Sequence, residues 1–329
     1  MIVARAPFRI TFGSGVVDVA ARARGENAPG LSVLSATLDK WVYATAHLRT
    51  DRKIVVGYSR RETVDAPDQL ENRLAAAVLR RADFLAGVEL HFVSELPIDA
   101  SGMGGSAAAT CAALVALYAM RGMSLDPAWL AEHAAAIEIA DLGRPVGRQD
   151  HVAAAYGGFA RLTFTGDRFA RNAFPRDSLD FLEDHATLLP CMDGASRDAS
   201  AALAGQAEAA NATGAADRLA RLADLAESAV RARKADLLAS VLNEAWDAKR
   251  ALGPGVSSPA ADALVAEVRV LGGGAKLCGA GGGGYVLAVL PDPRAARALA
   301  ERPGSVPVRF GRQGAHVVYD SGERSWLGR

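Results

Sequence analysis

The stretch Gly102-Met103-Gly104-Gly105-Ser106 has the residue types that a phosphate site requires. It runs into an alanine-rich apolar segment that predicts a buried helix to about Arg121. The first turn of a helix presents unpaired N–H groups and the positive end of the helix dipole, and glycines let an anion approach them. We therefore expect the main chain from Gly102 to Ala107 to hold a phosphate group. A tight strand-to-helix turn without a ligand is the alternative, and the Walker A pattern occurs nowhere in the chain.

A second glycine-rich segment follows Lys276 and reads LCGAGGGGY. Glycines cost backbone entropy in an ordered chain, so a run of them indicates that the main chain approaches another group closely. We expect that group to be a ligand or the first glycine stretch. Within the run, Gly281 and Gly282 are the predicted substrate contacts.

Two carboxylates lie in apolar sequence surroundings. Glu138 stands between two isoleucines on a segment with helical spacing, and Asp150 stands in VGRQDHVAAAYGGF among small and apolar residues. A carboxylate in such surroundings has to be paired, hydrogen-bonded or bound to a cation. Taken by themselves, the two residues are more typical of a helix surface or a helix cap.

The composition is that of a globular protein. The chain has 329 residues, half of them apolar, and a formal net charge of zero, which suffices for one large or two medium domains. No cluster of basic residues points to nucleic acid, and no apolar run approaches the ~18 residues of a membrane span. The start of the chain is too polar for a secretion signal and the three cysteines are isolated. We therefore expect a cytoplasmic protein without disulfides or a zinc site.

The pattern of apolar residues predicts an α+β protein in two lobes, residues 1–185 and 186–329. Strands are predicted over residues 2–12, 40–49, 54–59, 88–94, 159–164, 285–290 and 316–320. Helices are predicted over residues 68–86, 105–121 and 127–142, and in PDPRAARALAER near the C-terminal end. Two or three amphipathic helices are predicted between residues 197 and 252, with breaks near Gly214 and Lys234.

Three segments, in this order and at this spacing, resemble the GHMP kinases, a family that includes galactokinase, homoserine kinase, mevalonate kinase and phosphomevalonate kinase. They are the opening from Ala6 to Asp18, the segment from Pro97 to Ala107, and the loop from Lys276 to Gly284. RAPFRITF, SATLDKWVYA, VGRQDHVAAAYGGF and NEAWDAKRAL look most like the D-glycero-D-manno-heptose 7-phosphate kinase branch. The resemblance covers essentially the whole chain.

The resemblance implies a two-lobed fold, with a first lobe like domain 2 of ribosomal protein S5 and a ferredoxin-like second lobe. It implies ATP and Mg²⁺ as cofactors, with Ser106 and Glu138 as the metal ligands. Asp150 is then the catalytic aspartate, which accepts or orients the proton of the attacking hydroxyl group. Arg9 keeps Asp150 ionised and offsets charge on the phosphoryl oxygens. Without the resemblance, Arg9 reads as a surface strand residue.

The implied acceptor is a sugar, and the anomeric hydroxyl of a heptose 7-phosphate is the preferred one. Asp18 takes the position of the sugar-binding aspartate, and Ser196-Arg197 resembles a segment that would bind the 7-phosphate. The departures from the pattern affect this pocket most, because Val17 stands where the heptose branch has a threonine. Gly105 also stands where the family has its first serine. Whether the protein forms a homodimer stays open at this point.

Three other interpretations stay open at this point. A galactokinase- or fucokinase-like enzyme would act on an unphosphorylated sugar or a natural-product precursor. A dinucleotide-dependent oxidoreductase would use Gly13-Ser14-Gly15, although the third glycine of that fingerprint is missing. A non-catalytic binding protein on a kinase scaffold would have no physical reason to keep Arg9, Ser106, Glu138 and Asp150 together.

Overall fold

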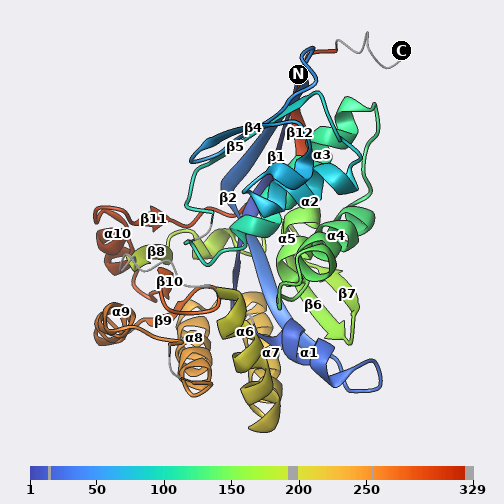
Figure 1. The fold of residues 1–329 in the computed structure, drawn as a ribbon. Helices are drawn as coiled ribbons and strands as arrows, with labels where there is room; N and C mark the ends of the chain where they lie inside the picture. The colour runs from blue at the N-terminus through green and yellow to red at the C-terminus, as the bar shows by residue number, and fades with distance from the viewer. Residues whose placement is uncertain (14–15, 99, 192–198, 254, 323–329) are drawn as a thin grey trace.

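The computed structural model describes residues 1–13, 16–98, 100–191, 199–253 and 255–322, and it builds them around two sheets (Figure 1). In these residues, the larger sheet has eight strands in the order β12-β1-β2-β5-β3-β4, with β6 and β7 continuing from β2. Every pairing in it is antiparallel except that of β3 with β5. Its strands are β1 (Ile2–Thr11), β2 (Leu31–Leu48), β3 (Ile54–Gly57), β4 (Arg61–Val64), β5 (Val88–Ser94), β6 (Phe159–Thr165), β7 (Arg168–Ala173) and β12 (His316–Asp320).

This sheet contradicts the dinucleotide-binding interpretation. A dinucleotide-binding fold places its glycine fingerprint in a parallel βαβ unit. Here the helix after the motif, α1 (Val17–Arg24), leads into β2, which lies antiparallel to β1. The oxidoreductase alternative is therefore wrong.

The long strand β2 differs from its prediction. The sequence predicts a strand over residues 40–49, but β2 begins at Leu31 and pairs with β6 through its first half and with β5 through its second half. Leu31–Leu38 is buried without alternation, because this half of the strand is covered on both faces. The alternation that marks a half-exposed strand appears only after residue 40.

Helices cover one face of the larger sheet (Figure 1). The central one, α3, packs on β1 and β2 and is buried along almost its whole length, because its alanines allow close contact on every side. Asp126 starts α4 as predicted, since its side chain accepts hydrogen bonds from the N–H groups of Ala128 and Trp129. The covering elements are η1 (Pro67–Gln69), α2 (Arg73–Arg81), α3 (Gly105–Met120), α4 (Pro127–Ala136) and α5 (Gln149–Tyr156).

The helix predicted over residues 127–142 has a different end. The α-helical part stops at Ala136, and one π-helical turn, Ile137–Asp141, follows it. Such a turn inserts an extra residue into the helical repeat and so changes the direction in which side chains point. It directs Glu138 into the interior, where only 3% of the residue is exposed.

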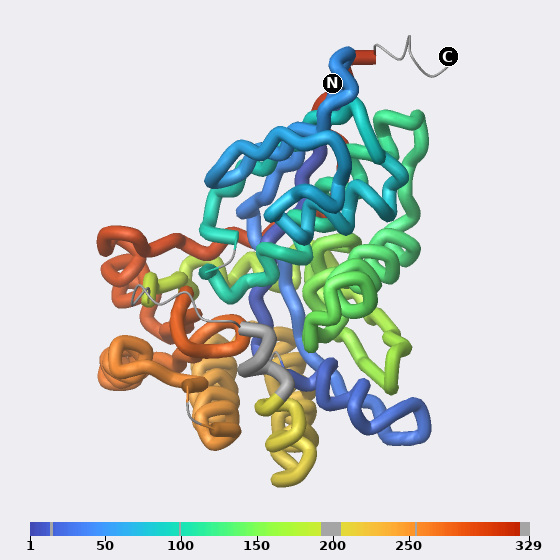
Figure 2. The backbone as a smooth tube through the Cα atoms, in the orientation of Figure 1, coloured from blue at the N-terminus to red at the C-terminus, as the bar shows by residue number. Residues whose placement is uncertain are grey.

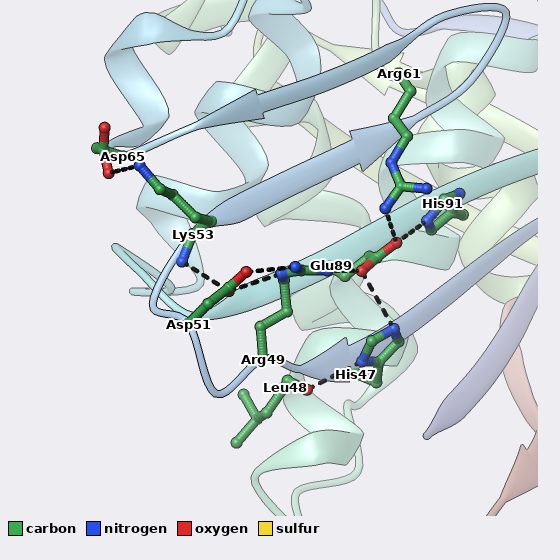
Figure 3. A network of polar contacts seen from close by, with 9 residues as sticks. All are labelled: His47, Leu48, Arg49, Asp51, Lys53, Arg61, Asp65, Glu89 and His91. Carbon is green, nitrogen blue, oxygen red and sulfur yellow. Dashed lines mark hydrogen bonds and ion pairs between the residues drawn. The ribbon is translucent and has the colours of Figure 1, made fainter.

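The opposite face of the sheet carries a polar cluster around Glu89 on β5 (Figure 3). Arg49 and Arg61 donate hydrogen bonds to the Glu89 carboxylate, and rings of His47 and His91 lie within ion-pair distance of it. Glu89 is 7% exposed, so its charge is met almost wholly by protein groups. We call these five residues the Glu89 cluster.

The smaller sheet has the order β11-β8-β10-β9 in the described residues, and all its pairings are antiparallel. Helices connect β8 to β9 and β10 to β11, which gives the βαββαβ order of a ferredoxin-like lobe. The helices break at Gly214 and Lys234, as predicted. The elements are η3 (Asp180–Leu182), β8 (Ala186–Cys191), α6 (Ala199–Ala212), α7 (Ala215–Arg231), α8 (Ala235–Arg250), α9 (Pro259–Val270), β9 (Gly274–Leu277), β10 (Gly284–Val289), α10 (Pro293–Ala300) and β11 (Val306–Pro307).

The chain returns to the larger sheet after the smaller one is complete. Strand β12 pairs with β1, and the amino group of Met1 donates a hydrogen bond of 2.7 Å to Ser321 (Figure 2 shows the N-terminal end beside the last described residues). The division into residues 1–185 and 186–329 stays a prediction. None of the helices in the described part of the chain combines the length and apolar character of a membrane span.

Candidate active site

The centre of the site is an ion pair between Arg9 on β1 and Asp150 in the first turn of α5. The guanidinium donates two parallel hydrogen bonds to the carboxylate, at 2.6 and 2.8 Å, and a third of 2.9 Å to the carbonyl oxygen of Gly102. Burial alone would lower the pKa of Arg9, but the contact with Asp150 raises it above its ordinary value. The Asp150 side chain keeps 28% of its surface exposed, so it can reach a ligand.

The first glycine stretch lies directly against this pair. Gly104 has φ of +75° and starts α3, and a Cβ atom there would lie 3.3 Å from the side chains of both Arg9 and Asp150. At Gly105 a Cβ atom would lie 2.3 Å from the carbonyl oxygen of Ile98, which leaves no space for the serine that the family pattern has. The open end of α3 therefore faces the ion pair.

The two glycine-rich segments are packed together. A Cβ atom at Gly279 would lie 2.5 Å from the Cα atom of Gly102, and one at Gly284 would lie 2.7 Å from the carbonyl oxygen of Ser101. The sequence left open whether the second segment approaches a ligand or the first segment. The structure shows the approach to the first segment. Gly281 instead faces Val256, where a Cβ atom would lie 2.5 Å from the carbonyl oxygen.

The predicted metal ligands converge on the side chain of Arg144. One nitrogen, Nη1, donates to Ser106 Oγ at 3.1 Å and to Glu138 Oε2 at 2.9 Å. The other carboxylate oxygen of Glu138 lies 3.1 Å from Nε2 of His151. Burial would raise the pKa of Glu138, but His151 and Arg144 together lower it to about 2, so the carboxylate stays charged.

Ser106 and Glu138 fit a divalent cation, because their oxygens already meet at one positively charged atom. Both are hard oxygen ligands of the kind that Mg²⁺ prefers. Within the described residues, no group of three His, Cys, Asp or Glu side chains could hold a metal ion alone. A cation here would have to complete its shell with water and ligand phosphates.

Asp18, the predicted sugar ligand, belongs to α1, and its side chain contacts the first residue of α5. Its carboxylate accepts hydrogen bonds from the main-chain N–H of Gln149 and from the Gln149 side chain, both at 3.0 Å, and it is 3% exposed. Burial raises the pKa of Asp18 to about 6, against the effect of the Gln149 hydrogen bond. Asp18 therefore positions the helix that carries Asp150, and its contact with a sugar stays a prediction.

Two buried lysines complete the surroundings. Lys276 on β9 donates to Thr11 Oγ1 at 3.0 Å and to the carbonyl oxygen of Gly13, and Lys249 on α8 donates to the carbonyl oxygen of Gly279. No role for Lys249, Lys276 or Arg144 was predicted from the sequence. Lys276 borders the glycine loop in sequence, but Lys249 gives no local signal.

A cavity of about 870 Å³ opens beside the start of α3. Ser106 and Arg144 lie at its wall with Pro97 and Ile98, and the rings of Tyr58 and Phe92 also line it. The structure thus places Arg9, residues 102–107, Asp150, Ser106 and Glu138 around one site. The predicted phosphate ligands Ser196 and Arg197 lie outside the described residues.

Comparisons with known proteins identify the domains. The model of the GHMP kinase N-terminal domain matches residues 70–158, and the model of the C-terminal domain matches residues 226–306, more than half of the chain together. A search of curated proteins found no significant match.

Solved structures share the fold at low identity. A D-glycero-D-manno-heptose 1-phosphate kinase from Bacteriodes thetaiotaomicron is 21% identical, with a TM-score of 0.74 over 97% of this chain and 100% of that one. Phosphomevalonate kinase of Streptococcus pneumoniae, in complex with phosphomevalonate and AMPPNP, is 15% identical, with a TM-score of 0.75 over 95% and 100%. Galactokinase of Lactococcus lactis, complexed with galactose, is 16% identical, with a TM-score of 0.69 over 96% and 94%.

Proposed function

Because this chain belongs to the GHMP kinase family, we propose that it transfers the γ-phosphoryl group of ATP to the anomeric hydroxyl of a heptose 7-phosphate. The family makes it an ATP-dependent phosphotransferase with an alcohol group as acceptor. The choice of acceptor is the proposal. One observation carries the chemistry: Arg9 and Asp150 form a bidentate ion pair, with two parallel hydrogen bonds, next to the open start of α3.

The nucleotide fits the cavity beside α3. The free N–H groups at the start of the helix suit its phosphates, and the wall with Tyr58 and Phe92 suits an apolar, flat base. Ser106, which lies at this wall, is also one of the two oxygens that suit the cation. Phosphates and cation therefore share one end of the cavity.

Asp150 handles the proton of the acceptor hydroxyl. Its carboxylate is partly exposed and is fixed in orientation by Arg9, so it can accept a hydrogen bond from a hydroxyl group and take its proton during attack. Arg9 is held by Asp150 and by the Gly102 carbonyl, which leaves its positive charge beside the loop that faces the phosphates. Ser106 and Glu138 would hold Mg²⁺, which neutralises charge on the phosphates when it is bound.

The structural neighbours support two kinds of acceptor. The heptose 1-phosphate kinase and the phosphomevalonate kinase are named for phosphorylated acceptors, which differ in their carbon skeleton. The galactokinase structure contains galactose, an unphosphorylated sugar. The sequence segments shared with the heptose branch favour the heptose phosphate. The galactokinase-like alternative would place an unphosphorylated sugar on Asp150.

An ADP-release assay with ATP, Mg²⁺ and a panel of sugars tests the proposal. The panel contains heptose 7-phosphate, free heptose, hexose 6-phosphates and free galactose, and mass spectrometry identifies the product. Turnover of heptose 7-phosphate to a bisphosphate is the expected result. Turnover of free galactose alone would reject the heptose phosphate in favour of the galactokinase-like alternative.

A further inference from the structure

Two positive charges beside the site have no carboxylate partner in the described residues. Lys249 and Lys276 are each 3% exposed, and the acceptors of their hydrogen bonds are carbonyl oxygens and one hydroxyl group. A buried charge costs much free energy unless an opposite charge meets it. Among the described residues, the six N–H donors of the two ammonium groups have three acceptors, so half of the donors remain for a ligand.

The use of lysine at these positions is selective. Of the 37 basic residues in the chain, only five are lysines, so arginine is the usual cation of this protein. Two of those five lysines are buried at this one place. Lysine supplies a compact point charge, whereas the planar guanidinium of arginine needs more space and more acceptors.

The position of the lysines relates them to the acceptor. Arg9 and Thr11 lie two residues apart on β1 and therefore on the same face of the strand, about 7 Å apart. Arg9 holds Asp150, and Thr11 accepts a hydrogen bond from Lys276. The separation is comparable to the span of a monosaccharide. A sugar with its reacting hydroxyl at Asp150 can thus extend toward the ammonium groups.

We propose that Lys249 and Lys276 form a binding site for a phosphate group that the acceptor already carries. The inference rests on the proposed kinase function and specifies its acceptor as a phosphorylated sugar. A phosphate dianion supplies the missing negative charge and accepts the remaining N–H donors. Burial and mutual repulsion lower the pKa of Lys249 to about 7, and burial lowers that of Lys276 to about 8, which agrees with an anion site that is poised to regain charge.

The γ-phosphate of the nucleotide is the other possible source of the anion. The test therefore measures binding of inorganic phosphate by calorimetry in the presence of saturating AMP-PNP, when the nucleotide site is filled. Lys249→Met and Lys276→Met keep the length of the side chain and remove its charge, and Lys234→Met on the exposed start of α8 is the control. The same variants are titrated with AMP-PNP alone.

The expected result is that phosphate binds the wild type and the Lys234 variant, and that it binds each buried-lysine variant roughly tenfold more weakly or worse. The affinity for AMP-PNP should not change. Equal phosphate binding by all variants, or a lysine effect on AMP-PNP instead, would overturn the proposal. Since no turnover is measured, an absence of kinase activity would count against the proposed function and leave this result intact.

A second measurement needs no variant. With ¹⁵N-lysine labelling, the chain has only five side-chain ammonium groups. Addition of phosphate to the AMP-PNP complex should shift two of their signals. Signals that remain unchanged would contradict the site even if both methionine variants failed to fold.

Discussion

The Glu89 cluster and the lysine pair are two buried charge centres of opposite kinds. Glu89 is met by two arginines and two histidines, so the protein itself neutralises the carboxylate (Figure 3). Lys249 and Lys276 are met by neutral oxygens alone in the described residues. Glu89 and the two lysines are each less than a tenth exposed, although the partners of Glu89 reach the solvent. What separates these two centres is the balance of charge around each one.

The two centres should therefore respond differently when their charge is removed. At Glu89, where partners within the protein balance the charge and none of the described site residues is in contact, its removal should cost stability and leave function unchanged. Where the balance needs a ligand, its removal should affect binding or turnover more than stability.

The largest effect is expected for Asp150→Asn. The amide keeps the shape of the side chain but cannot take a proton, so kcat should fall by about 10²- to 10⁴-fold. Steady-state kinetics measure this loss. The rise in melting temperature caused by AMP-PNP should persist, which shows that the nucleotide site is intact. Turnover within a few-fold of wild type would remove the assigned role of Asp150.

Glu138→Gln should weaken the binding of Mg²⁺ to the AMP-PNP complex by roughly tenfold or more, because it removes the charged ligand of the cation. Calorimetric titration with Mg²⁺ measures the effect without turnover. Glu132→Gln, on the exposed face of α4, is the matched control. If both variants bound Mg²⁺ as wild type does, the site between Ser106 and Glu138 would be wrong.

Glu89→Gln should lower the free energy of unfolding by about 2 kcal/mol, since it leaves two arginines near a neutral group. Denaturant unfolding measures this cost, and kcat and phosphate affinity should stay at their wild-type values. Glu267→Gln disrupts an exposed pair with Arg302 and should cost no more than about 0.5 kcal/mol. A kinetic defect in the Glu89 variant would break the division between the two centres.

A pH-dependent gain in stability, in contrast to the losses above, is expected for Lys249→Met. In the folded protein, Lys249 releases its proton near pH 7, whereas in the unfolded chain it keeps the proton up to about pH 10.5. The burial cost is therefore fully present below pH 7 and disappears as the pH rises toward 10.5. The variant should gain stability on the order of a few kcal/mol at pH 6, and the gain should shrink toward pH 10. Unfolding curves at both values, with Lys234→Met as the control, measure the difference.

The sequence predicted those parts of the fold and site that depend on nearby residues. The start of α4 follows from Asp126 and Pro127, and the breaks between α6, α7 and α8 follow from Gly214 and Lys234. The first glycine stretch was also predictable as a phosphate site, because glycines directly before an apolar helix form a local pattern. The family resemblance then indicated the carboxylates.

The parts that sequence could not predict depend on distant residues. The helix α5 begins where the carboxylate of Asp18, 131 residues earlier, accepts the N–H of Gln149. The first half of β2 shows no alternation of buried and exposed residues, because neighbouring elements cover both of its faces. It therefore could not be recognised as a strand from the sequence. Lys249 approaches the site only after α8 packs on β9, and Arg144, which follows the π-helical turn, meets Ser106 from 38 residues away.

The return of β12 to the larger sheet has a mechanical consequence. The chain passes between the two sheets once after β7 and again after β11, so two covalent connections tether one body to the other. Two connections restrict the motion of one sheet relative to the other more than a single connection would. We therefore expect X-ray scattering in solution to find one overall radius with and without nucleotide.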